Sequence, residues 1–144
     1  MFADFLKRLT EPTPTPLPDT DARLALTALL VRVARSDNDY SASERARIQG
    51  IIEARYSLND ADRDALLRDA ETLETEAPDT VRFTRAIKDA VAYEDRLAVV
   101  EALWQVALAD GARAKEEDAL LRLVANLLGI TDMDSAQARQ RAGG

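Results

Sequence analysis

A turn between two helices decides the fold of this chain. Residues 107–118 read Ala-Leu-Ala-Asp-Gly-Ala-Arg-Ala-Lys-Glu-Glu-Asp. An apolar helix ends before Asp110-Gly111, and a second helix begins in a cluster of carboxylates. Asp-Gly is a common turn dipeptide because glycine accepts a positive φ. The stretch therefore predicts a helix–turn–helix unit with an acidic turn.

A weaker copy of this unit lies upstream. Shifting residues 24–52 by 73 positions lays them on residues 97–125. The shift pairs Asp37 with Asp110, Glu44 with Glu117, Leu30 with Leu103, Val31 with Trp104, and Ile48 with Leu121. Apolar matches alone are weak evidence, because all amphipathic helices share one period. The acidic pairs in the same register make the repeat credible, and they predict two related helical halves.

The amino-acid composition limits both the fold class and the kinds of chemistry that the chain could carry out. The 144 residues are 47% hydrophobic, 31% charged and 5% aromatic, with a net charge of -7. This composition favours one all-α domain. The acidic balance and the lack of a Lys/Arg cluster exclude a nucleic-acid-binding surface. The chain has no Cys and no His, which removes disulfides, thiol and histidine catalysis, and the usual Zn, Cu and Ni ligands. A bound metal would be Ca²⁺ or Mg²⁺, held by oxygen.

Hydrophobic spacing predicts a single bundle of about seven to eight helices, built from two pseudo-repeated halves. Residues 20–142 form the helical domain, and residues 1–19 form a short N-terminal helix and a Pro-rich linker. In the domain, Ser41 and Glu44 form a capping box, Gly129 ends one helix, and Asp132 caps the last helix. The expected helix starts are near Asp19, Ser41, Asn59, Asp79, Tyr93, after Gly111, and at Asp132. Trp104 is expected in the core, as are Val81, Phe83, Ile87 and Val91.

The N-terminal segment and the hydropathy pattern bear on location. Residues 2–9 have apolar side chains at helical spacing, which predicts a helix that packs on the helical domain. A peripheral membrane contact is the weaker interpretation, because one short helix with two cations is a poor membrane anchor. Residues 10–18 carry four alternating prolines and form an extended spacer. No apolar run reaches membrane-spanning length, and no secretory signal is present. A cytoplasmic location is expected.

The acidic turns raise the possibility of an ion site. The first turn starts like an EF-hand but has Ala42 where the loop needs Gly and Ile48 where it needs Glu, so an EF-hand is rejected. If two hairpins pack about a pseudo-twofold axis, their carboxylates converge, and a divalent cation would relieve a repulsion of a few kcal/mol. The candidate metal ligands are Asp37, Glu44, Asp110 and Glu117, with Asp39 and Glu116 less certain.

Structural capping explains the same carboxylates in another way. Acidic groups in the first turn of a helix complement its dipole, and Glu44 already has the partner Ser41. Glu117 lacks such a partner because Ala114 stands at its cap position. The residues alone leave capping and ion binding both open.

Several segments of the second half form a recognisable pattern. They are Glu94-Asp95-Arg96-Leu97, Leu103-Trp104-Gln105-Val106-Ala107, Ala109-Asp110-Gly111, Glu117 and Leu127-Leu128-Gly129. With these segments the chain resembles the TerB-like family, named from bacterial tellurite resistance. The resemblance spans about residues 22–140. By motif it implies functional roles for Asp110 and Glu117, and by repeat for Asp37 and Glu44. The chain departs from the pattern at Asn38, where the second copy has Gly111.

The resemblance implies a helical bundle of two related halves, an acidic surface that binds divalent metal, and a role in stress response or tellurite resistance. Related domains beside J-domain co-chaperones imply a protein partner. The leading hypothesis is a non-enzymatic protein with a metal-responsive surface. The alternative is a metal-free adaptor that binds another protein through a helical face. An enzyme is the third hypothesis, and it would need carboxylate-only or metal-assisted chemistry.

Overall fold

The structure is a computed structural model that describes residues 19–35, 40–77, 79–107 and 115–143, with side chains described from residue 21 and, in α7, from residue 119. These ranges hold seven helices and no strand. The helices are α2 (Asp19–Ala34), α3 (Ala42–Tyr56), α4 (Asp60–Glu76), α5 (Thr80–Ala90), α6 (Tyr93–Ala107), α7 (Lys115–Leu127) and α8 (Asp132–Arg141). The all-α bundle expected from the sequence is confirmed.

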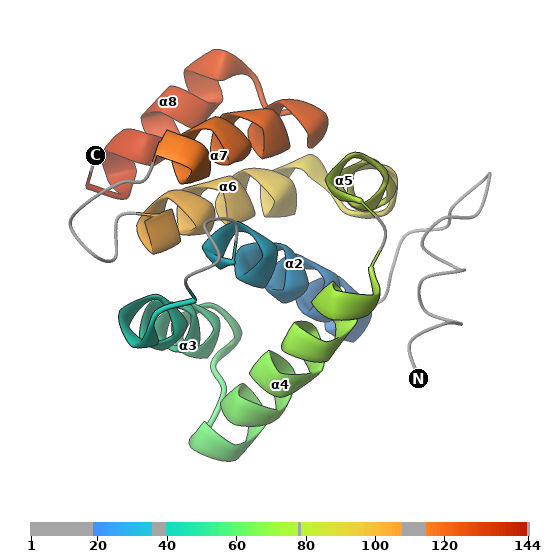
Figure 1. Ribbon diagram of the computed structural model, residues 1–144, viewed down its shortest axis with the longest axis vertical. Helices are drawn as coiled ribbons and strands as arrows, with labels where there is room; N and C mark the ends of the chain where they lie inside the picture. Colours follow the sequence, from blue (N-terminus) through green and yellow to red (C-terminus); the bar gives the residue numbers. More distant parts are fainter. Residues whose placement is uncertain (1–18, 36–39, 78, 108–114, 144) are drawn as a thin grey trace.

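Helix α2 lies at the centre of the bundle (Figure 1). It contacts α3, α4, α5, α6 and α7. Every residue from Ala25 to Val31 is buried, because this helix is apolar on nearly all sides and needs cover on each. The polar member of this run, Thr27, donates its hydroxyl to the carbonyl of Arg23 at 2.7 Å.

Helix α6 is the second element of the core. Its buried residues include Val100, Leu103 and Trp104, and the prediction of a core tryptophan is confirmed. In the view of Figure 1, α2 and α6 run toward the same side of the molecule, and the two helices are in contact.

Local signals set the helix ends much as the sequence predicts. Ser41 and Glu44 form the expected capping box on α3. Asn59 and Asp79 cap α4 and α5 by accepting from a backbone N–H three residues later. Gly129 has φ +75 beyond the end of α7.

Two details differ from expectation. Thr131, rather than Asp132, caps α8, since the Thr131 hydroxyl accepts from the Asp134 N–H at 3.1 Å; Asp132 is the first residue of the helix. Val81 is 41% exposed, whereas Phe83, Ile87 and Val91 are buried as predicted. Val81 lies in the first turn of α5, where the helix has not yet entered the core.

The contacts between helices can be compared with the two related halves that the sequence predicts. Helix α2 contacts α3, α4 and α7, and α6 contacts α7, α8 and α3. These sets correspond when α2, α3 and α4 are exchanged for α6, α7 and α8. The internal repeat stays a prediction that this pattern accommodates.

The N-terminal predictions fall largely outside the described part of the chain, because residues 1–18 carry both the docked helix and the Pro-rich linker. Within the described residues, none of the helices combines the length and the apolar character needed to cross a membrane.

Candidate functional site

Only one of the six candidate metal ligands has a described side chain. Asp37, Asp39 and Asp110 lie outside the described residues. Glu116 and Glu117 stand in the first turn of α7, but their side chains also lie outside the described part. Among the described residues, no group of three or more acidic side chains gathers in a way that could hold a metal ion. The convergence of the two turns stays a prediction.

Glu44 is the candidate ligand that the structure places. Its side chain is buried, and the residue is 2% exposed. Glu44 Oε1 accepts from the Ser41 hydroxyl at 3.1 Å and from the Ser41 N–H at 3.4 Å, while the Glu44 N–H donates to Ser41 Oγ at 3.1 Å. The capping role predicted for this carboxylate is therefore confirmed, and it fixes the side chain directly after the first acidic turn.

The helices that lead into the two turns are buried at their ends. Ala34 closes α2 with no exposed surface, and Ala107 closes α6 at 2% exposure. Helices α2 and α6 pack together and run the same way in Figure 1, so their C-terminal ends lie on the same side of the bundle.

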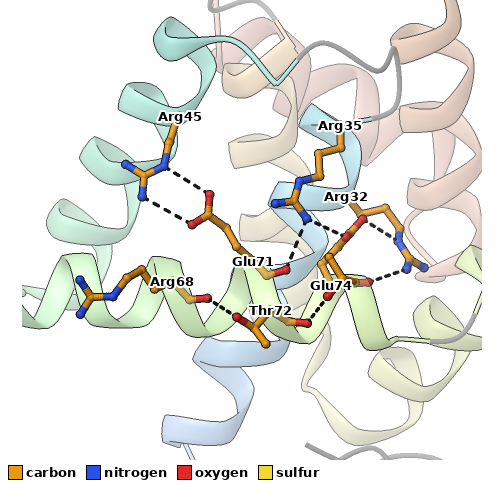
Figure 2. Close-up of polar contacts among 8 residues, drawn as sticks. Arg32, Arg35, Arg45, Arg68, Glu71, Thr72 and Glu74 are labelled. Atoms are coloured by element: carbon orange, nitrogen blue, oxygen red, sulfur yellow. Dashed lines mark hydrogen bonds and ion pairs between the residues drawn. The ribbon is translucent and has the colours of Figure 1, made fainter. Parts of the chain in front are cut away.

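A cluster of arginines and glutamates holds the first turn's flanks to α4 (Figure 2). Arg35, the last described residue before the turn, places Nη1 3.0 Å from Glu74 Oε2 and donates to the Glu71 carbonyl at 3.3 Å. Arg32 Nε lies 3.5 Å from Glu74 Oε1. Glu74 thus pairs with two guanidinium groups, one from the last turn of α2 and one from the residue that follows it.

Beyond the turn, α3 contacts the same face of α4. Arg45 approaches Glu71 with two nitrogens, Nε at 3.2 Å and Nη2 at 3.5 Å from the two carboxylate oxygens. This hydrogen bonding raises the pKa of Arg45, so the guanidinium stays charged. Fork-shaped pairing of this kind is geometrically specific, and it fixes the spacing between α3 and α4.

Tyr40 joins the two sides of this cluster. It is the first described residue after the turn, and the Arg35 guanidinium carbon lies 5.2 Å from its ring centroid. Burial raises the pKa of the Tyr40 hydroxyl well above its usual value, and the negative charge of Glu71 adds to the effect. Arg35 and Tyr40, which bracket residues 36–39, are therefore both coupled to α4.

Sequence reasoning missed this cluster. The signal was present in matched spacing, since Arg32 and Arg35 are three residues apart at the end of α2, as Glu71 and Glu74 are on α4. Residues three apart share a helix face. Periodicity along one helix, however, does not say which other helix that face meets.

The chain was compared with known proteins. The family model described as tellurite resistance protein TerB matches residues 23–140, which covers α3 to α7, all but the first turn of α2 and all but the last residue of α8. Neither the curated proteins nor the solved structures gave a match. Because the match spans most of the chain, and because the all-helical bundle agrees with the expected fold, this chain belongs to the TerB family of tellurite resistance proteins.

Proposed function

We propose that this protein is a non-enzymatic, cytoplasmic member of its family whose two acidic turns form a divalent-cation-responsive surface used in stress response, including resistance to tellurite. The ligands would be Asp37, Glu44, Asp110 and Glu117, with Asp39 and Glu116 beside them. The ion would be Ca²⁺ or Mg²⁺, since all these ligands are oxygen donors.

One observation carries the proposal. The buried ends of α2 and α6, Ala34 and Ala107, lie in two packed helices that run the same way. The acidic residues that follow each helix are therefore expected at one end of the bundle. The capping box supports this, because it holds Glu44 directly beside the first turn.

Repulsion between the carboxylates would make the site responsive to a bound cation. A chain of net charge -7 attracts cations over its whole surface. Several carboxylates at one end of the bundle would repel one another by a few kcal/mol per close pair at an effective dielectric near 20. Binding a divalent cation removes this repulsion and stabilises the folded state through mass action.

Thermal unfolding of the full chain tests the proposal. Melts in EDTA, in Ca²⁺ and in Mg²⁺ are compared at equal ionic strength. An ion at about 100 times its Kd stabilises by about 2.7 kcal/mol, which raises the Tm of a domain of this size by several degrees. The double variant Asp110→Asn/Glu117→Gln should lose the shift.

A matched control distinguishes a specific cation site from the general effect of the protein's negative charge. Asp69→Asn/Glu76→Gln removes the same charge from two exposed positions of α4 and should keep the whole shift. Equal shifts in both double variants, or no shift with either ion, would exclude the site and leave the metal-free adaptor. Pull-downs with and without the acidic residues then test that alternative.

A further inference from the structure

A hollow of about 360 Å³ lies between α6, α7 and α8, and one of its arginines, Arg139, has no acidic partner among the described residues. The lining of the hollow includes Trp104 of α6, Arg122 of α7, and Ser135 and Arg139 of α8. Arg139 forms no ion pair and no hydrogen bond with any residue in the described part of the chain. This is notable in an acidic protein, where Arg141 on the same helix pairs with Glu101 at 2.9 Å.

The ring of Trp104 holds the Arg139 guanidinium in place. The guanidinium carbon lies 5.2 Å from the ring centroid, and Trp104 is 2% exposed, so the ring is a rigid support. Stacking uses the face of the guanidinium and leaves its N–H groups in the plane. Nε is buried without a hydrogen-bond partner among the described residues, while the Arg139 residue as a whole is partly exposed. Arg139 therefore presents oriented, unused donors to the hollow.

The other residues that line the hollow limit which ligands it could bind. Ser135 lies one helical turn before Arg139, on the same face of α8, and its hydroxyl can donate as well. Asp132 also lines the hollow, but it lies seven residues before Arg139, about 10 Å along the helix axis. Along α8, the lining therefore runs from an acidic residue to a basic one, and an anion is accommodated at the Arg139 end.

We propose that the Arg139 end of this hollow binds a small oxyanion, a carboxylate or phosphate group on a small molecule. Arg139 donates to two of its oxygens in the side-by-side geometry that guanidinium groups adopt with oxyanions, and Ser135 supplies a further donor. Trp104 positions Arg139 without touching the ligand's charge. The acidic end at Asp132 repels a second anionic group. This proposal does not depend on the divalent-cation proposal.

Trp104 provides the readout, because it is the only tryptophan of the chain. The full chain is titrated with inorganic phosphate and, separately, with acetate, while NaCl keeps the ionic strength constant. The expected result is a saturable change in tryptophan fluorescence with at least one of the two. The anion that saturates at the lower concentration identifies whether the site prefers phosphate or carboxylate.

Two variants decide whether Arg139 is responsible. Arg139→Gln should weaken binding at least tenfold. Arg141→Gln removes the same charge from the same helix and should change affinity less than twofold. Equal losses in both variants would mean general electrostatic attraction, and NaCl alone producing the change would also overturn the proposal.

A second measurement keeps the test valid if Arg139→Gln unfolds the chain. In the ¹⁵N-labelled wild-type protein, the Arg139 side-chain resonance should shift with the same Kd as the fluorescence. Ser135→Ala should weaken binding several-fold while leaving the fold intact. A resonance that does not move during a saturating titration would contradict the site.

Discussion

Arg35 Nη1 lies 3.0 Å from Glu74 Oε2, and this ion pair ties the end of α2 to α4. Glu74 is only 13% exposed at its side chain, and it also accepts Arg32. The Arg32 guanidinium in turn lies over the Phe83 ring of α5, 5.3 Å from its centroid. One carboxylate therefore organises the region where α2, α4 and α5 meet.

Replacing this carboxylate should destabilise the fold. Glu74→Gln leaves two partly buried guanidinium groups with a neutral partner, and the expected loss is about 1.5–3 kcal/mol of unfolding free energy, the range for hydrogen bonds to charged groups. Urea denaturation measures it. Glu76→Gln changes the same charge on the exposed face of α4 and should stay within about 0.5 kcal/mol. Similar losses in both variants would show that net charge, and not this contact, is responsible.

The three tyrosine hydroxyls of the folded protein should ionise at a higher pH than a free tyrosine side chain does. Burial raises the pKa of Tyr40 and of Tyr56 above the usual value, and a 2.5 Å hydrogen bond to Asp134 raises that of Tyr93. A raised folded-state pKa means that the folded chain binds more protons than the unfolded chain above pH 10. Stability from these groups is therefore complete below about pH 10 and is lost as the pH rises further.

Absorbance at 295 nm measures this titration directly. We expect no tyrosine of the native protein to titrate at the ordinary value, and the tyrosinate signal should rise together with alkaline unfolding. Tyr93→Phe should remove one ionisation and change the unfolding pH only slightly, because Tyr93 is 36% exposed and solvent screens its interaction with Asp134. Full ionisation of all three groups near pH 10 with the fold intact would contradict the prediction.

Two glycines should respond to alanine with opposite signs. Gly129 has φ +75, its N–H donates to the Asn126 carbonyl, and the Ile130 N–H donates to the Ala125 carbonyl, which is the Schellman pattern at a helix end. A Cβ there would lie 3.0 Å from Lys88 Cε and 3.2 Å from Arg96 Nη1. Gly129→Ala should therefore cost at least about 1–2 kcal/mol, the penalty of a left-handed residue.

Gly50 provides the matched comparison. It lies inside α3, and a Cβ at this position meets no atom within 4 Å. Gly50→Ala should stabilise by about 0.5–1 kcal/mol, because alanine loses less backbone entropy in a helix. The difference in denaturation midpoint between the two variants is the measurement. Destabilisation by Gly50→Ala would contradict the prediction.

The sequence predicted the helices well because their signals are local. Ser41, Asn59 and Gly129 each act on the turn of chain beside them, so a single sequence shows both the residue and its effect. Asp132 was the exception, since Thr131 is an equally good cap one residue earlier. The prediction that Val81 is buried was wrong. Its position fits the apolar stripe of the helix, but its exposure depends on where the helix enters the bundle.

Contacts between helices could not be predicted in the same way. The side chains of Glu71 and Glu74 look like ordinary exposed acids of a charged helix. Only the packing of α4 on α2 brings Arg32 and Arg35 within reach of them. The candidate ion site has the same difficulty, since it requires two turns separated by 73 residues to meet. Spacing suggests that meeting but cannot establish it.

Glu44 offers the sharpest test of what the first turn does, because capping and ion binding make different predictions for it. Glutamine can complete a capping box as glutamate does, so Glu44→Gln in EDTA should cost at most about 2 kcal/mol, the upper limit for a charge at a helix end that is shielded from solvent. If Glu44 is a ligand, the same variant should lose much of the Tm shift produced by Ca²⁺ or Mg²⁺. Ser41→Ala is the converse change: it removes the cap at a cost of about 1 kcal/mol but keeps the carboxylate, so the ion-induced shift should survive. A full ion response in Glu44→Gln, together with its loss in Glu117→Gln, would restrict the site to the second turn and leave Glu44 as a cap alone.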